Sequence, residues 1–340
     1  MWNAVTAAAK AAAMTYSKAR LSWTVCATTA LWLFYCSAAI ANPAPDILDW
    51  AYPMNPTSVP PPAPDDGALR RVPGSDQSFT LTRIRDLYGV PDWHPGDHPP
   101  MPQVVARGRK PAIYACGYCH LPNGLGRPEN ASLAGLPAPY IEQQIADFQR
   151  GTRGTAKPDR VPASLMIQNS KGLTNAEMSD AAEYFASLVP RPWVHVIEST
   201  TVPVTHVSAW ARLPTAGESE PIGDRIIEVP EDPVLFVARD ARAGFVAYVP
   251  PGSIAKGEDL VRRGGVDGVP CGTCHGTDLR GLGPIPGIAG RSPSYLVRQL
   301  YEFQHGIRAG SWSALMAPQV KGLSPDDMIS IAAFAASLEP

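Results

Sequence analysis

The feature that most constrains this chain is a five-residue pattern, Cys-x-x-Cys-His, that occurs at residues 116–120 and again at residues 271–275. In each copy two thiols lie one helical turn apart and a histidine follows directly. This spacing is the attachment pattern of c-type haem, in which both thiols bond to the haem and the histidine ligates the iron. One copy alone would fit chance or half of a zinc site. Two copies predict two covalently bound c-type haems, held through Cys116, Cys119, Cys271 and Cys274, with His120 and His275 as proximal axial ligands.

Longer repeats surround the two patterns. Residues 134–153 recur 155 positions later, and residues 165–188 recur 150 positions later. The chain therefore contains two copies of one module, which we place at residues 104–190 and 253–340. A module of this size buries too little apolar surface to be stable alone. We expect the haem to complete each core, so that its loss unfolds the module.

Each module reads as helical. A helix with an apolar face is expected around Tyr140, and Gly151 is suited to end it. The last segment of each module is also expected to be a helix, with Thr174 or Ser324 as its N-cap residue. The apolar faces of these last helices should pack on the first helix of the same module.

A haem iron that only carries electrons needs a second axial ligand, and methionine is a common choice. Met166 and Met316 occupy equivalent repeat positions, in segments expected to be loops that reach over the far face of the haem. Met178 and Met328 lie on helix faces and are typical of core filling. The sequence therefore predicts Met166 and Met316 as the distal ligands.

Each proximal histidine also needs an acceptor for its other ring nitrogen, usually a backbone carbonyl. Pro286 is the expected acceptor in the second module. The aligned residue in the first module is Ala131, with Pro128 nearby but out of register, which leaves the first acceptor open.

Two further residue pairs are ambiguous from the sequence. Arg153 and Arg308 are equivalent in the repeats and are interpreted either as partners of haem propionates or as solvated helix ends. His94 and His98 are four positions apart, but a Pro-Gly pair between them breaks any helix. A surface or haem-edge role is therefore favoured over a metal site for these histidines.

The N-terminal segment has the features of an export signal. Residues 1–41 contain a basic region, an apolar stretch and an Ala-Ile-Ala end that fits a cleavage site. A retained membrane anchor and a lipid-modified Cys36 are the alternatives. All three place the remaining chain outside the cytoplasm, and we predict the periplasm. Four of the six cysteines belong to the haem patterns and the other two lie in this segment, which leaves none for a disulfide in residues 42–340.

Two segments lie outside the modules. Residues 42–103 are rich in proline and are expected to form an extended arm over the first module, with one short helix near Thr80–Tyr88. Residues 191–252 contain short β-like runs at 193–197, 225–229, 234–237 and 244–249, which predict a small β-rich insert between the modules. The chain has 29 Lys and Arg against 31 Asp and Glu, a balance that argues against nucleic acid as a partner.

Taken together, these residues resemble the tandem di-haem cytochromes c of the c4 type. The resemblance rests on each Cys-x-x-Cys-His, the Ala-Gly that follows, the Tyr-x-x-x-Gln-x-x-x-Phe helix, the methionine and the closing helix. It implies a mainly α protein with two class I cytochrome c folds. Such proteins carry electrons in the periplasm from a quinol-oxidising complex or dehydrogenase to a terminal oxidase. The β-rich insert and the Pro-rich arm depart from the family pattern and leave domain packing and partner choice open.

The sequence thus predicts an electron carrier rather than an enzyme, with both haem edges near the Cys-x-x-Cys turns as docking surfaces. One alternative is an enzyme similar to the di-haem cytochrome c peroxidases, which needs one haem with an open distal position. Both modules here retain an equivalent methionine, which favours the carrier. The other alternative is a dedicated cytochrome subunit of a dehydrogenase, for which the insert and the arm would serve as docking elements.

Overall fold

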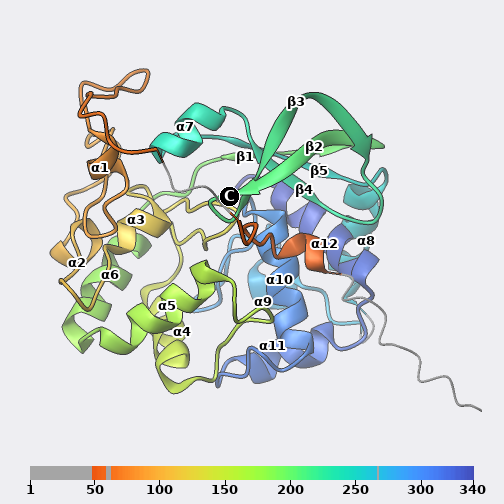
Figure 1. Cartoon of the computed structure of the whole chain (residues 1–340). Coiled ribbons are helices and arrows are strands. Elements are labelled where there is room, and N and C mark those ends of the chain that lie inside the picture. Colours follow the sequence, from red (N-terminus) through yellow and green to blue (C-terminus); the bar gives the residue numbers. More distant parts are fainter. Residues whose placement is uncertain (1–47, 59–62, 266–267) are drawn as a thin grey trace, which may run out of the picture. The chain divides into compact units, whose positions relative to one another are not determined.

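The computed structural model describes residues 48–58, 63–265 and 268–340, all within one structural unit, Pro45–Pro340 (Figure 1). The predicted signal or anchor, residues 1–41, lies outside the described residues. Among the helices of the described part, none has the length and apolar character needed to cross a membrane. The described chain is mostly helical with small sheets.

The first haem pattern lies within a set of five helices. These helices are α2 (Gln103–Ala106), α3 (Cys116–His120), α4 (Ala138–Arg150), α5 (Val161–Gly172) and α6 (Asn175–Ser187). Helix α4 ends at Gly151, whose φ of 73° is in the left-handed region that glycine adopts without strain. Helix α6 begins with the predicted cap: Thr174 Oγ1 accepts from Glu177 N at 3.2 Å, and Glu177 Oε2 accepts from Thr174 N at 2.9 Å. Both helix ends are confirmed.

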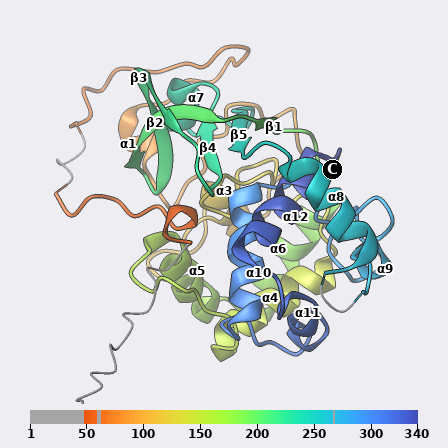
Figure 2. The ribbon, with the colours of Figure 1, turned by 90° about the vertical axis from the view of Figure 1, so that its right-hand side faces the viewer.

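The second haem pattern has a corresponding set of helices, α8 (Ser253–Arg263), α9 (Gly272–His275), α10 (Pro293–Gln304), α11 (Ser313–Val320) and α12 (Pro325–Ser337). Ser324 and Asp327 form the second capping box. Helix α12 packs along α8, as predicted, and the two lie side by side in Figure 2. The approach is close at Gly257, where a side chain would collide with the carbonyl of Ser330.

The segment between the modules contains all of the named strands, which lie together beside the helices in Figures 1 and 2. A three-stranded sheet has the order β1 (Val194–Glu198), β5 (Phe245–Val249), β4 (Ile227–Pro230), with β1 parallel and β4 antiparallel to β5. A separate hairpin is formed by β2 (Thr201–Ser208) and β3 (Ala211–Pro221), which the sequence analysis missed.

One predicted strand in this segment is wrong. Residues 234–237 lie in helix α7 (Pro233–Ala238). The Asp232 carboxylate accepts from the backbone N–H groups of Val234 and Leu235, and Pro233 occupies the first turn. An N-cap acid followed by proline starts a helix even where the next residues favour strands.

The N-terminal arm contacts more than the first module. Its regular elements are η1 (Asp49–Ala51) and α1 (Leu81–Ile84). Leu48 and Tyr52 are buried in the apolar core of the second module. Farther along, Trp93 is 2% exposed and its Nε1 donates to the carbonyl of Ala238 at 2.8 Å. The expectation that the arm drapes over the first module is therefore only part of the arrangement, because the arm also supplies core side chains to the second.

Candidate functional site

Both proximal histidines are oriented in the same way. His120 Nδ1 donates to the carbonyl of Ala131 at 2.8 Å, and His275 Nδ1 donates to the carbonyl of Pro286 at 2.8 Å. Burial lowers the pKa of each imidazole, which favours the neutral form. A proton on Nδ1 leaves Nε2 as the lone-pair donor for a metal. The Pro286 acceptor is confirmed, and Ala131 takes the equivalent role that the sequence left open.

The two Cys-x-x-Cys-His patterns share one cavity of about 350 Å³. It is lined by all four cysteines, both histidines and both predicted methionines. Apolar side chains at repeat-equivalent positions complete the walls, namely Ile141 and Leu296, Ile145 and Leu300, Phe148 and Phe303, and Leu173 and Leu323. Paired thiols, a histidine with a bare Nε2 and an apolar wall are the groups that a c-type haem requires, so the residues present fit two such haems.

The methionines line this cavity from helices, not from loops. Met166 lies within α5 and Met316 within α11, and both side chains are half-buried. The loop expectation is therefore wrong for the backbone. A helix fixes the direction of a side chain more tightly than a loop does, and both methionines remain predicted ligands.

Arg153 is buried between the two modules, with 8% of its surface exposed. Its Nη1 donates to Gln144 Oε1 at 2.9 Å within its own module. Its Nη2 donates to the Tyr295 hydroxyl at 3.1 Å and to Gln299 Oε1 at 3.0 Å in the other module. The interpretation of Arg153 as a solvated helix end is wrong.

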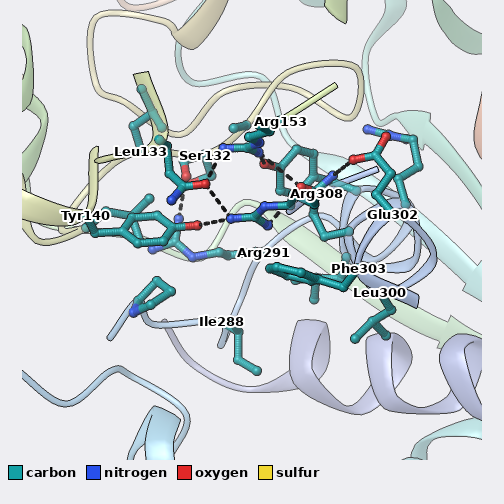
Figure 3. A pocket seen from close by; sticks show the side chains of 18 of the residues that line it. Ser132, Leu133, Tyr140, Arg153, Ile288, Arg291, Leu300, Glu302, Phe303 and Arg308 are labelled. Carbon is teal, nitrogen blue, oxygen red and sulfur yellow. Dashed lines mark hydrogen bonds between the residues drawn. The ribbon is translucent and has the colours of Figure 1, made fainter. Parts of the chain in front are cut away.

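Arg308 makes the reciprocal set of contacts and is 6% exposed. It donates to Gln299 Oε1 at 3.0 Å in its own module, and to the Tyr140 hydroxyl at 2.9 Å and Gln144 Oε1 at 2.7 Å in the other. Figure 3 shows Arg308 directed toward the Tyr140 hydroxyl. Because each residue meets the repeat equivalents of its own partners, the modules face each other through a self-complementary surface, as in a twofold dimer.

Comparison with known proteins identifies the modules. The family model described as Cytochrome c matches residues 105–188. Cytochrome c-554(548) of Halomonas halodenitrificans is 40% identical over 89 residues, which cover 26% of this chain and 99% of that protein. The chain belongs to the cytochrome c family.

A second relative matches a larger part of this cytochrome. The thiosulfate dehydrogenase electron acceptor of Thiomonas intermedia is 26% identical over 212 residues, which cover 61% of this chain and 70% of that protein. Among solved structures, reduced recombinant cytochrome c4 from Pseudomonas stutzeri is 21% identical with a TM-score of 0.43, over 66% of this chain and 93% of that chain. Membership of the family makes this cytochrome a haem-containing electron-transfer protein.

The insert covers the first Cys-x-x-Cys turn of this cytochrome. Arg239, just after α7, donates to the carbonyl of Tyr118 and stacks on its ring at 3.9 Å. Arg127, 3% exposed, stacks on the ring of Phe236 at 3.6 Å and pairs with Glu129 at 2.9 Å. Side chains of the insert therefore lie against the first turn, where a docking surface was expected, and Tyr118 and Cys119 are half-buried.

The second turn is open. Thr273 and Cys274 are exposed, and Leu282, the repeat equivalent of Arg127, is 60% exposed. The two modules therefore differ in access although their sequences repeat.

The surface or haem-edge role predicted for His94 is wrong. Its side chain is 3% exposed, and Nε2 donates to the buried carboxylate of Asp240 at 3.0 Å. It ties the arm to the insert, where neither a surface nor a haem-edge role applies. Sequence reasoning also missed the buried cations Arg160, Arg291 and Arg298, which line the cavity. The repeat equivalents of Arg291 and Arg298 are Leu136 and Gln143, so the repeat does not point to these arginines, and nothing in the sequence distinguishes them from surface arginines.

Proposed function

We propose that this chain is a periplasmic di-haem cytochrome c that accepts electrons from a dehydrogenase and passes them to a downstream acceptor such as a terminal oxidase. The observation that carries the proposal is the doubled ligand set. Each half of the cavity offers two thiols, one oriented histidine and one methionine. The leader predicted at residues 1–41 supports export, where c-type haem is attached.

Cys116, Cys119, His120 and Met166 would hold one haem, and Cys271, Cys274, His275 and Met316 the other. When bound, each haem supplies a one-electron Fe(III)/Fe(II) couple. The residues of the chain would occupy the ligand positions of each iron and hold those ligands in fixed orientations. The carbonyls of Ala131 and Pro286 hold the imidazole planes, and the helices α5 and α11 carry the two methionines that line the same cavity. Ligands that stay in place in both oxidation states suit electron transfer without substrate binding.

The donor class is inferred from the relative in Thiomonas intermedia, which is described as the electron acceptor of thiosulfate dehydrogenase. We propose that a dehydrogenase of a reduced inorganic sulfur compound docks on the open second turn. There Leu282, a large apolar side chain that is 60% exposed and does not line the cavity, offers the kind of surface that partner proteins cover.

The first test is spectroscopic. Purified exported protein should give two c-type haems per chain in a pyridine haemochrome assay and the weak absorption band of methionine-ligated ferric haem. Carbon monoxide and peroxide should leave its spectra unchanged. A high-spin iron that binds carbon monoxide would instead favour the peroxidase-like enzyme and remove one of the methionine assignments.

The second test addresses the donor. Thiosulfate together with a thiosulfate dehydrogenase should reduce the cytochrome rapidly, and neither component alone should do so. Leu282→Glu should slow this reduction about tenfold or more, because docking would bury the new carboxylate without a partner. Leu69→Glu is the matched control, since Leu69 is 66% exposed but lies in the N-terminal arm. Equal rates for both variants would exclude the second turn as the docking surface.

A further inference from the structure

One arginine joins the two loops that orient the proximal histidines. Arg291 is buried, with 8% of its surface exposed, and uses every nitrogen of its guanidinium group. Nε donates to the carbonyl of Gly287 at 2.6 Å in its own module. Nη1 donates to the carbonyl of Ser132 at 2.7 Å and Nη2 to that of Ala134 at 3.3 Å, both in the other module. Figure 3 shows Arg291 reaching toward Ser132.

These peptides adjoin the two histidine acceptors. Ala131, which accepts from His120, directly precedes Ser132, and Pro286, which accepts from His275, directly precedes Gly287. Neighbouring peptide planes are rigid and share a Cα atom. Fixing the carbonyls of 132 and 287 therefore restricts the carbonyls of 131 and 286, one residue away.

The bridge is specific to this residue. The repeat-equivalent position of Arg291 is Leu136, so a single side chain serves both modules. Its three acceptors are neutral carbonyls, and burial lowers the pKa of Arg291 to about 10, which still leaves it charged at neutral pH. A planar guanidinium can hold three carbonyls in fixed directions, which an ammonium on a flexible stem cannot do.

We propose that Arg291 is a positioning residue that holds the acceptor peptides of both proximal histidines, so that one side chain sets the axial-ligand geometry of both haems. This inference rests on the proposed function, because it requires haem at both motifs. Partners of a metal-bound histidine fix its ring orientation and its basicity. A change at Arg291 should therefore reach both irons together.

The test compares Arg291→Met and Arg291→Lys in the haem-loaded protein by electron paramagnetic resonance of the ferric state and by redox titration. Both low-spin signals should shift in both variants, because the signal of low-spin haem reports ligand orientation. In Arg291→Met, which also loses a buried positive charge, the oxidised-to-reduced ratio at each wild-type midpoint should rise about tenfold, or about 59 mV for a one-electron couple. Arg291→Lys keeps the charge, so its midpoints should move less.

The matched control is Arg160→Met. Arg160 is 3% exposed and lines the same cavity. Within the described part of the chain its side chain donates to two backbone carbonyls, those of Pro53 and Trp210, which adjoin neither histidine acceptor. Its loss should leave both ferric signals at their wild-type positions. The inference is overturned if either haem keeps its wild-type signal in Arg291→Lys, or if Arg160→Met shifts both signals equally. Two haems with unmoved signals would overturn this inference alone, whereas a count of one haem would overturn the proposed function as well.

Discussion

The reciprocal arginines between the modules predict a specific departure from additivity. In Arg153→Met, the oxygens of Gln144 and Gln299 lose one donor each but still accept from Arg308, at 2.7 and 3.0 Å. Only the Tyr295 hydroxyl loses its arginine partner altogether. Arg308→Met is the mirror case, in which both glutamine oxygens still accept from Arg153. Each guanidinium therefore protects the acceptors of the other.

The magnitude follows from which acceptors are left without a donor. A hydrogen bond from a charged donor contributes about 1.5–3 kcal/mol, so each single variant should lower the free energy of unfolding by about 2–3 kcal/mol. The double variant Arg153→Met/Arg308→Met leaves both glutamine oxygens unpaired between the modules, at about 1–3 kcal/mol for each buried acceptor. The first substitution also relieves repulsion between two like charges, a gain that the second substitution cannot repeat. The double variant should therefore cost at least about 2 kcal/mol more than the sum of the singles.

The assay is guanidinium unfolding of the haem-loaded protein, followed by far-ultraviolet circular dichroism and by haem absorbance, in a double-mutant cycle. The control cycle pairs Arg153→Met with Arg263→Met, because the Arg263 side chain is 61% exposed and pairs only with Asp259 among the described salt bridges. That cycle should be additive within about 0.5 kcal/mol. Additivity in the Arg153 and Arg308 cycle would refute the shared-acceptor reasoning.

Three further outcomes are expected. Ser324→Ala removes the cap that accepts from Asp327 N at 3.1 Å and should lower the free energy of unfolding by about 1 kcal/mol, whereas Ser337→Ala, at the other end of α12, should change it much less. Burial raises the pKa of Glu228 above its ordinary 4.5, so protonated Glu228 stabilises the fold in acid, and this contribution declines as the pH rises through the folded-state pKa. In denaturation curves measured at a series of pH values, Glu228→Gln should flatten that decline. An unchanged pH dependence of stability would contradict the raised pKa of Glu228. Protein made without haem attachment should lack a cooperative thermal transition, and a sharp transition in that apoprotein would show that the modules do not need haem to complete their cores.

Local features of the fold were predictable because short-range chemistry decides them. The capping residues Thr174 and Ser324 act on backbone groups three positions away, and Gly151 ends its helix through its own φ angle. The acceptor Pro286 could be placed because the loop between it and His275 is short. In each case the partners lie close together in the sequence, so the pattern contains the answer.

Features that depend on distant contacts were not predictable. From the sequence, Arg153 could be interpreted as a solvated cation at a helix end. Its partners Tyr295 and Gln299 belong to the other module and lie more than a hundred residues away, so the sequence did not reveal these contacts. His94 is drawn inside by Asp240, which belongs to the insert. The strand expected at 234–237 follows from its valines, but the cap at Asp232 outweighs that preference.

The departures from the repeat are where the two modules acquire different roles. Duplication alone would give two equal modules with two equal docking edges. At one pair of equivalent positions, Arg127 is buried under the ring of Phe236 while Leu282 is 60% exposed. At another, Leu136 is an apolar core residue while Arg291 binds both modules together. Side chains of the insert lie against the first turn, whereas Thr273 and Leu282 of the second are exposed. If a partner docks on the second turn as proposed, an electron accepted there would have to cross the shared interface to reach the first module.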